Sequence, residues 1–363
     1  MKKTFTIGLA ALALGLTSCS KEEVSKTDIA SKSNEISFST YSNLTKGAPY
    51  TSNEDFETAG NSFGVSAFIF TTDGSTDNND SPYLGSSDVG AEIVYGTDWE
   101  HNLASEIRYW PTNGEELDFY AYTPYTDDSQ TLNLSFDKTD GLTITGYTVP
   151  TAEADQVDFM FASALDLTSP NSVDDVLLQF SHGLVQVHFT ANTTSSNMYV
   201  EIAANGISIN NIYSSGNLDI SSTTESTGAW SGQSDLASYT FTSSKVTIDS
   251  EGDSEAITSS DNSLMLLPQE FTEWNVDGDL DATDSNQTGA YLAITCKIYS
   301  QTTSDSGDAS NVYLVGDSET YVTIYLPISS TDDCGDEIWV MGNKLTFDLA
   351  FGGGYDVEGD PIL

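Results

Sequence analysis

The sequence predicts an all-β protein built from sandwich domains. From Glu35 onward, short segments alternate apolar and polar residues with period two, as in the run from Phe63 to Phe70. Clusters of Gly, Asn, Asp and Ser separate these segments at short intervals, a pattern typical of antiparallel sandwiches. No segment keeps a helical period over more than about ten residues, so we expect very little helix.

The chain begins with a secretory signal. Lys2 and Lys3 give it a positive start, and residues 7–16 form an apolar run of about ten residues, too short to span a bilayer. Cys19 directly follows Leu16-Thr17-Ser18, which resembles a bacterial lipobox. The resemblance implies that residues 1–18 are removed and that Cys19 is acylated. The alternative is an ordinary secretory signal with a chance cysteine.

The remaining chain divides into a tether and two domains. Residues 19–33 are small, polar and charged, so we expect a flexible tether. The loop at 166–174 contains Pro170 and is the best boundary, which gives an N-terminal sandwich at 34–172 and a C-terminal sandwich at 173–363. Strands are expected at 36–39, 63–70, 117–122, 132–136, 142–145, 176–189, 199–202, 207–209, 238–241, 246–248, 264–268, 291–299, 321–326 and 345–349. Polar insertions at 221–235, 250–263 and 300–311 are interpreted as exposed hairpin tips.

The charge balance excludes some partners. The 363 residues include 55 Asp and Glu against 11 Lys and Arg, a formal net charge of -44. Such a field repels nucleic acid and anionic membrane surfaces, and it keeps an exported protein soluble. We therefore expect no nucleic-acid partner.

Few residues suggest catalysis, a cofactor or a metal. His182 and His188 lie six residues apart on one expected strand, which separates them by roughly 20 Å, so they cannot share a metal. We interpret His182 as a half-buried structural residue, with a bulge near Gly183. No phosphate loop, nucleophile elbow or zinc-binding helix motif occurs. We expect no enzymatic activity and no cofactor.

One acidic run has oxygen ligands spaced as in a calcium loop. The aspartates are Asp277, Asp279, Asp281 and Asp284. Ala282 occupies the place of the usual glycine and Thr288 that of the bidentate glutamate, so a solvated acidic turn is the alternative to a calcium site.

Two further cysteines follow Cys19. Cys296 alternates with Leu292, Ile294 and Ile298 and is expected to point into a core, whereas Cys334 lies in a loop rich in Asp and Gly. A disulfide between Cys296 and Cys334 is conceivable in an oxidising compartment, but two cysteines do not make a disulfide framework.

A set of motifs occurs in a fixed order along the chain: Trp110-Pro111, Leu117 to Pro124, Asp158 to Ala162, Phe180 to Leu184, Leu264 to Gln269, and Trp339 with Gly342 to Phe347. Together they resemble the fimbrillin (Mfa-like) family of Bacteroidetes lipoproteins, over roughly residues 35–355. The resemblance implies two tandem transthyretin-like β-sandwich domains and a subunit of a type V pilus, or fimbrium.

The resemblance also implies how the subunit assembles. A groove left by loss of the N-terminal strand accepts an extended strand from a neighbouring subunit. Here the displaced strand would run from Glu35 to Tyr41 and include Ile36 and Phe38. Lipid on Cys19 would carry the precursor to the outer membrane, and Ser20-Lys21-Glu22-Glu23 is similar to a surface-export signal.

The sequence departs from the family pattern at the protease cleavage site and at the C-terminal strand that a subunit would donate to its neighbour. Family stalk subunits are cut after an arginine beyond the first strand, whereas the only arginine here is Arg108 and Lys46 occupies the equivalent place. Either a lysine-tolerant protease cuts at Lys46, or the subunit stays anchored by its lipid. The chain stops at Leu363 without a final hydrophobic strand, so it is either clipped or accepts a strand without donating one. Stalk, tip and anchor roles all stay open.

The alternative function is a surface glycan-binding lipoprotein that contacts a host or bacterial glycan or protein. Exposed aromatic side chains on long loops would favour it, because sugars stack on aromatic faces. Trp230 is the candidate residue, and the competing interpretation is a loop anchor packed on the sandwich.

Overall fold

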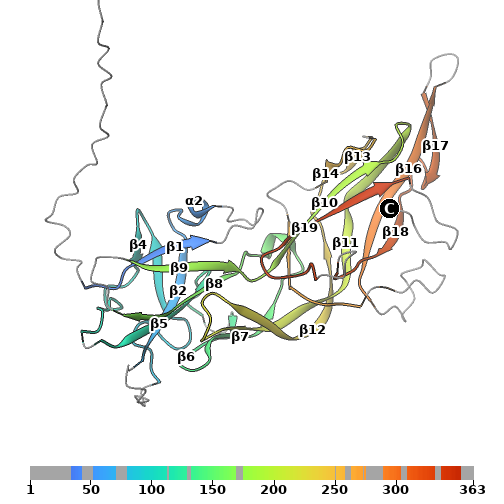
Figure 1. The fold of residues 1–363 in the computed structure, drawn as a ribbon. Coiled ribbons are helices and arrows are strands. Elements are labelled where there is room, and N and C mark those ends of the chain that lie inside the picture. Colours follow the sequence, from blue (N-terminus) through green and yellow to red (C-terminus); the bar gives the residue numbers. More distant parts are fainter. Residues whose placement is uncertain are drawn as a thin grey trace, which may run out of the picture.

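The computed structural model is built almost entirely of β-strands, which confirms the all-β prediction (Figure 1). It describes residues 34–42, 52–70, 80–112, 114–128, 132–168, 175–249, 251–257, 263–272, 274, 289–303, 309–331 and 337–352. Within these ranges the helices are one turn of α-helix, α2 (Asn53–Phe56), and one 3-10 turn (Glu153–Asp155). The strands form two lobes that are joined by long strands (Figure 1).

The first lobe is built on a seven-stranded sheet with the order β1-β9-β8-β5-β2-β3-β4. Its strands are β1 Phe38–Ser42, β2 Ser62–Phe70, β3 Ala91–Tyr95, β4 Trp99–His101, β5 Glu116–Thr123, β8 Met160–Thr168 and β9 Val176–His182. Neighbouring strands are antiparallel except β1 and β9, which run parallel.

The second lobe contains two further sheets. The larger has the order β17-β16-β11-β7-β6, with β12 and β13 beside β11 and β18 beside β16. Its strands are β6 Leu134–Asp137, β7 Gly141–Thr148, β11 Met198–Ile220, β12 Gly228–Thr240, β13 Val246–Ile248, β16 Tyr291–Thr303, β17 Ala309–Val315 and β18 Val322–Pro327. In the smaller sheet, β10 (Val185–Thr193) pairs with three strands, which are β14 (Glu255–Ala256), β15 (Leu264–Leu266) and β19 (Lys344–Phe351).

Strand β11 connects the two lobes. Apolar residues recur along its inner face, and they are buried from Val200 to Ile220. Its first part pairs with β16 and its last part pairs with β7. The domain boundary predicted between residues 172 and 173 lies outside the described residues. Strands that precede this boundary pair with strands that follow it: β7 pairs with β11, and β8 pairs with β9.

The apolar residues form two clusters, one in the first lobe and one that extends from β2 and β5 through the second lobe. Phe189 packs edge-to-face on Phe241 in the second cluster, with ring centroids 4.8 Å apart. Cys296 belongs to the same cluster as a free, buried thiol, and burial raises its pKa to about 12. Its inward orientation agrees with the sequence alternation, and Cys334 lies outside the described residues.

Each of the three polar insertions contains strand residues, including β14 within 250–263, which corrects the expectation of exposed tips. Residues 228–240 form β12 along β11, so only the segment around 221–227 is a hairpin turn. The segment at 300–311 belongs largely to the β16–β17 hairpin. β12 is rich in Gly, Ala and Ser and is mostly exposed, so it lacks the apolar alternation that marks a half-buried strand.

A buried carboxylate lies at a bulge between β5 and β8. The register shifts at Asp118, and Asp118 Oδ1 accepts a hydrogen bond of 2.7 Å from the backbone N–H of Asp166, which has a φ of 56°. Burial raises the pKa of Asp118 to about 6, and the neighbouring carboxylates of Asp166, Glu116 and Glu225 act in the same direction. The bulge therefore carries an electrostatic cost at neutral pH.

We expect Asp118→Asn to stabilise the protein at pH 7 by about 1–2 kcal/mol. The amide oxygen still accepts the Asp166 N–H bond but carries no charge. The folded pKa of Asp118 lies above its ordinary value of 3.8, so the native carboxyl loses stability as the pH rises through about 6. The gain should therefore disappear below about pH 4. Urea denaturation at both pH values measures it, with Asp140→Asn at an exposed turn as the control. Equal gains at both pH values would contradict this account.

Candidate functional site

Strand β1 lies at the edge of the first sheet, where it pairs with β9, and the residues just before it pair with another part of the chain. Along β9 its register runs from Phe38 opposite Val176 to Ser42 opposite Phe180. Just before β1, the N–H of Ile36 donates to the carbonyl of Arg108 at 2.9 Å. The segment therefore lies between β9 and the chain around residues 108–110.

The side chains of this segment alternate strictly. Ile36, Phe38 and Thr40 point inward and are 0%, 4% and 5% exposed, whereas Tyr41 is 44% exposed. Full burial of an Ile or Phe side chain stabilises a fold by roughly 1.5–3 kcal/mol. The inward face thus makes β1 a substantial part of the core, although it is an edge strand.

Phe38 fills an aromatic pocket. Its ring meets Phe63, Phe119 and His101 with centroid distances of 5.8, 6.0 and 5.9 Å, all in edge-to-face geometry. Such pairs add about 0.5–1.5 kcal/mol beyond area burial. The pocket therefore selects for an aromatic side chain at this point of the strand.

Thr40 joins the strand to the turn that covers it. The indole N–H of Trp99 donates to Thr40 Oγ1 at 3.0 Å, and the side-chain amide of Asn53 donates to the Thr40 carbonyl at 3.3 Å. Asn53 begins α2, which Ser52 caps by accepting from the N–H of Asp55. The pocket requires a small hydroxyl residue at this position, because a larger side chain would displace Trp99.

His101 gives the site a pH dependence. Its Nε2 lies 3.4 Å from the carbonyl oxygen of Ile36, and burial lowers its pKa below the ordinary value. The lowered folded pKa disfavours the imidazolium, so stability is present above the ordinary His pKa and is lost as the pH falls through the folded value. Acid therefore weakens the surroundings of β1.

Of the two residues expected in the first strand, Phe38 lies in β1 and Ile36 lies just before it, and both are buried. Lys46, the expected processing point, lies outside the described residues, as do Cys19 and the aspartates Asp277, Asp279, Asp281 and Asp284. A cut at Lys46 would leave β1 attached to the protein only by non-covalent contacts.

The histidines of the sequence analysis have structural surroundings. His182 ends β9 and His188 lies in β10, so the single strand expected for both is interrupted at Gly183 and Leu184. His182 is buried, with Nδ1 2.9 Å from Asp158 Oδ1. Burial lowers the pKa of His188 to about 4, and Lys344 acts in the same direction. Within the described ranges no group of His, Cys, Asp and Glu is arranged to hold a metal.

Trp230 is a packing residue. It lies in β12 opposite Leu218, and its indole N–H donates to the carbonyl of Gly183 at 2.7 Å. Its ring packs on Tyr147 at a centroid distance of 5.5 Å. This side chain therefore anchors the β11–β12 hairpin to the junction of β9 and β10.

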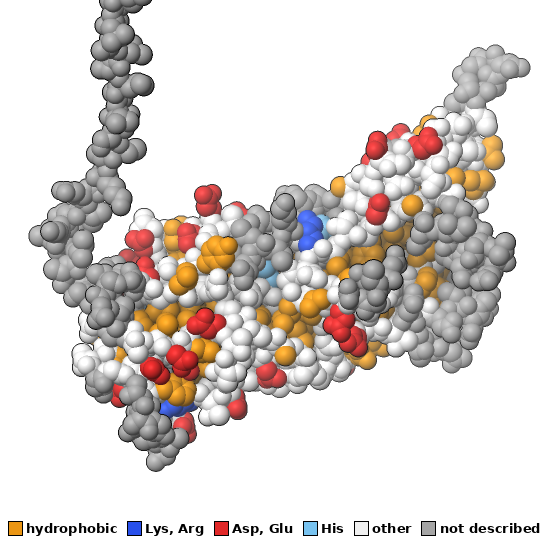
Figure 2. Space-filling view, in the orientation of Figure 1, with side chains coloured by type: hydrophobic (Ala, Val, Ile, Leu, Met, Phe, Trp, Pro, Cys, Tyr) orange, Lys and Arg blue, Asp and Glu red, His pale blue; other side chains and the backbone are white. Residues whose placement is uncertain are grey.

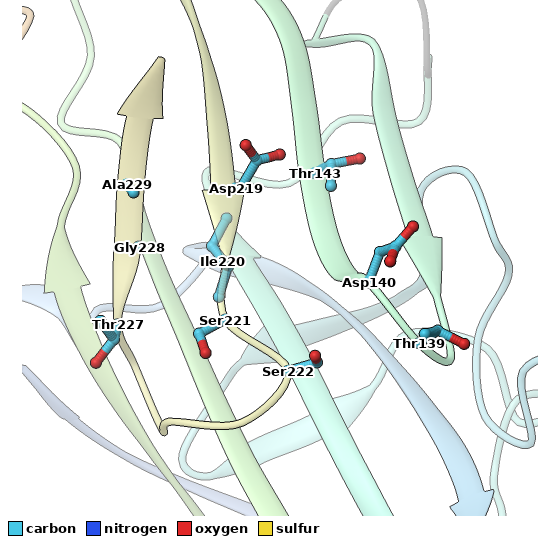
Figure 3. A pocket seen from close by; sticks show the side chains of 10 residues that line it. All are labelled: Thr139, Asp140, Thr143, Asp219, Ile220, Ser221, Ser222, Thr227, Gly228 and Ala229. Carbon is cyan, nitrogen blue, oxygen red and sulfur yellow. The ribbon is translucent and has the colours of Figure 1, made fainter.

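A surface pocket of about 510 Å³ lies between the β6–β7 turn and the β11–β12 hairpin (Figure 3). Hydroxyl groups and two carboxylates line it, from Thr139, Thr143, Ser221, Ser222, Thr227, Asp140 and Asp219. None of its lining residues is His, Cys, Lys or Arg. The pocket lacks the paired acid, base or nucleophile arrangement of a catalytic site.

The sequence did not identify the residues that contact β1 and the segment just before it. Trp99, His101 and Asn53 lie 13 to 65 positions away from the residues that they contact. Only the aromatic character of Trp99 marked it as a core residue. Among the described residues, no helix has the length and apolar character needed to cross a bilayer.

Comparisons with known proteins agree with this architecture. A fimbrial protein from Bacteroides vulgatus has 16% sequence identity and a TM-score of 0.57, over 88% of this chain and 95% of that one. Two cell adhesion proteins, described as putative, from Bacteroides uniformis and Bacteroides ovatus have TM-scores of 0.40 and 0.42, with 12% and 15% identity. The match to the Bacteroides uniformis protein covers 88% of this chain and 93% of that one. The match to the Bacteroides ovatus protein covers 87% of this chain and 91% of that one.

The search of curated proteins gives no match. The family model described as fimbrillin-like matches residues 45–360. That match covers most of the chain, so the protein belongs to the fimbrillin-like family.

Proposed function

We propose that the protein is a structural subunit of a type V fimbrium that is assembled at the cell surface by donor-strand exchange and contributes to adhesion. The observation that carries the proposal is β1, a strand at a sheet edge whose inward Phe38 fills an aromatic pocket. The family match and the likeness to a fimbrial fold support the same assignment. The proposal assigns no enzymatic step to the subunit.

The free-energy cost of an empty groove supports replacement of β1 by another strand over the loss of β1 alone. Without β1, the backbone edge of β9 would lose its partners and the rings of Phe63 and Phe119 would face water. Both effects are costly, so the groove favours any extended segment that restores them. Such a segment needs apolar side chains at alternate positions to match the pocket.

The proposed route begins with a lipoprotein. Acylated Cys19 holds the precursor at the outer membrane, and proteolysis at Lys46 separates β1 from the remaining chain. Strand exchange with another fimbrial subunit then replaces β1. Without cleavage the lipid stays attached, and the subunit is an anchor. The proposal covers stalk, tip and anchor roles, which differ only in these steps.

The glycan-binding alternative depended on Trp230. Its indole N–H is bonded to Gly183 and its ring packs against Tyr147, so the side chain has a structural role.

The first test concerns the pocket for β1. In the full chain, Phe38→Ala should lower the free energy of unfolding by about 3–5 kcal/mol, because it removes a buried ring and leaves a cavity. Tyr41→Ala, on the outward face of the same strand, should cost less than about 1 kcal/mol. Urea denaturation compares the two variants. Equal losses would mean that the alternation of β1 does not determine its attachment.

The second test concerns processing. We expect fimbriae sheared from cells to contain subunits that begin near Gly47, and unheated gels to show ladders of polymers. Lys46→Ala should abolish both, because β1 then stays covalently attached. Lys32→Ala lies in the tether before β1 and should change neither. Ladders built from subunits that retain Cys19 would contradict cleavage, and their absence from the unaltered protein would contradict polymer assembly.

A further inference from the structure

Strands β17 and β18 form one sheet edge on the outer side of β16. β17 pairs with the second half of β16, from Thr303 opposite Ala309 to Tyr299 opposite Tyr313, and β18 pairs with the first half. The other side of β16 pairs with β11. In Figure 1 the β16–β17 hairpin extends beyond the body of the second lobe, with β17 at the outer margin.

The β17 edge carries exposed apolar side chains. Val312 is 51% exposed and Leu314 is 60% exposed, and Figure 2 shows hydrophobic side chains at the margin of this hairpin. A register shift at Leu314 interrupts the ladder with β16, which resumes where Val315 lies opposite Ile298. The backbone edge from residue 310 to 313 continues the sheet without a partner among the described residues.

β17 lacks the charge and the proline that protect many edge strands, although one register shift lies near its end. Natural edges are kept short, charged, bulged or interrupted by proline. The sequence Ala-Ser-Asn-Val-Tyr-Leu-Val of β17 contains no charged residue and no proline, in a chain with 55 acidic residues. Several other described edges have such protection: β4 has three residues and Glu100, β6 has four and Asp137, and β12 has two register shifts and Asp235. The edge strand β1, like β17, has neither a charge nor a proline.

Tyr313 continues an aromatic ladder across the sheet. The Tyr199 and Tyr299 rings stack with centroids 5.4 Å apart and an angle of 9°, and Tyr299 and Tyr313 are also 5.4 Å apart. The three tyrosines lie on neighbouring strands, β11, β16 and β17. The ladder reaches the edge of the sheet at Tyr313.

We propose that β17 pairs edge to edge with β17 of a second copy of this chain, antiparallel and centred on Tyr313. This register places Val312 opposite Leu314 of the other copy, twice by symmetry, and it brings the two Tyr313 rings together. A second copy is the fitting occupant, because its own β17 offers the same uncharged edge. This contact involves no residue of the β1 groove and does not depend on strand exchange.

The net charge of the protein determines how the contact responds to salt. Two copies with a formal charge of -44 repel each other over long range, whereas the strands that touch are neutral. Salt screens the repulsion and leaves backbone pairing and apolar burial unchanged. The dimer should therefore become tighter as ionic strength rises, unlike an association held by salt bridges.

Sedimentation velocity of the uncleaved chain from residue 20 onward tests this proposal, because its retained β1 prevents strand exchange. We expect a monomer–dimer equilibrium that shifts at least tenfold toward dimer between about 0.05 and 0.5 M NaCl. Val312→Lys should weaken the dimer at least tenfold. Leu236→Lys, which makes the same charge change at a side chain 61% exposed in β12, should leave it unchanged.

A second measurement tests the register. Tyr313→Cys should form a disulfide-linked dimer under mild oxidation, whereas the unaltered chain treated in the same way should not. A protein that stays monomeric at about 100 µM in high salt would overturn the proposal, as would a dimer that Val312→Lys leaves intact. A dimer that is sensitive to Val312→Lys, but that the Tyr313→Cys variant does not cross-link, would overturn the register centred on Tyr313.

Discussion

The continuous segment of β9 and β10 is the constraint on which the arrangement of both lobes depends, because it carries a parallel pairing in each. β9 continues through Gly183 into β10, and β10 pairs in parallel with β19, from Gln186 opposite Lys344 to Thr193 opposite Phe351. One chain segment, 176–193, is thus flanked in each lobe by a parallel strand from an end of the folded chain. Parallel neighbours cannot be joined by a tight hairpin, so both contacts are long-range. Contacts that close large loops are slow to form during folding.

The junction between β9 and β10 keeps these two pairings in a fixed relation. The N–H of Gly183 donates to the carbonyl of Phe159 at 2.8 Å, and its own carbonyl accepts from Trp230. A Cβ at Gly183 would lie 2.9 Å from the Phe159 ring, so a side chain here would displace the strand next to it. His182 and Asp158 pair beside this point. The glycine, the His182–Asp158 contact and the indole thus meet at the point where β9 ends and β10 follows.

The sequence predicted the features that depend on local pattern. Alternation placed Ile36, Phe38 and Cys296 on inward faces, because neighbouring side chains along a strand decide that orientation. It could not assign β1 to β9, since their pairing joins residues 138 positions apart and depends on packing against Phe63 and Phe119. The first part of β12, within 221–235, was interpreted as a hairpin tip because its residues are small and polar, and pairing with β11 makes it a strand. Register and partner choice are tertiary properties, and no local pattern carries them.

The acidic parts of the surface repel other copies of the protein, whereas the uncharged strands are suited to contact with another chain. Acidic side chains lie over both lobes (Figure 2), and their long-range repulsion keeps copies apart at low salt. The segment from Ile36 to Ser42 contains no charged residue, and neither does β17. Backbone pairing at a sheet edge buries the side chains next to it, so a charge there would have to be desolvated or paired. Neutral strands in so acidic a chain are therefore the segments at which another chain can approach closely, while the remaining surface limits contact to those edges.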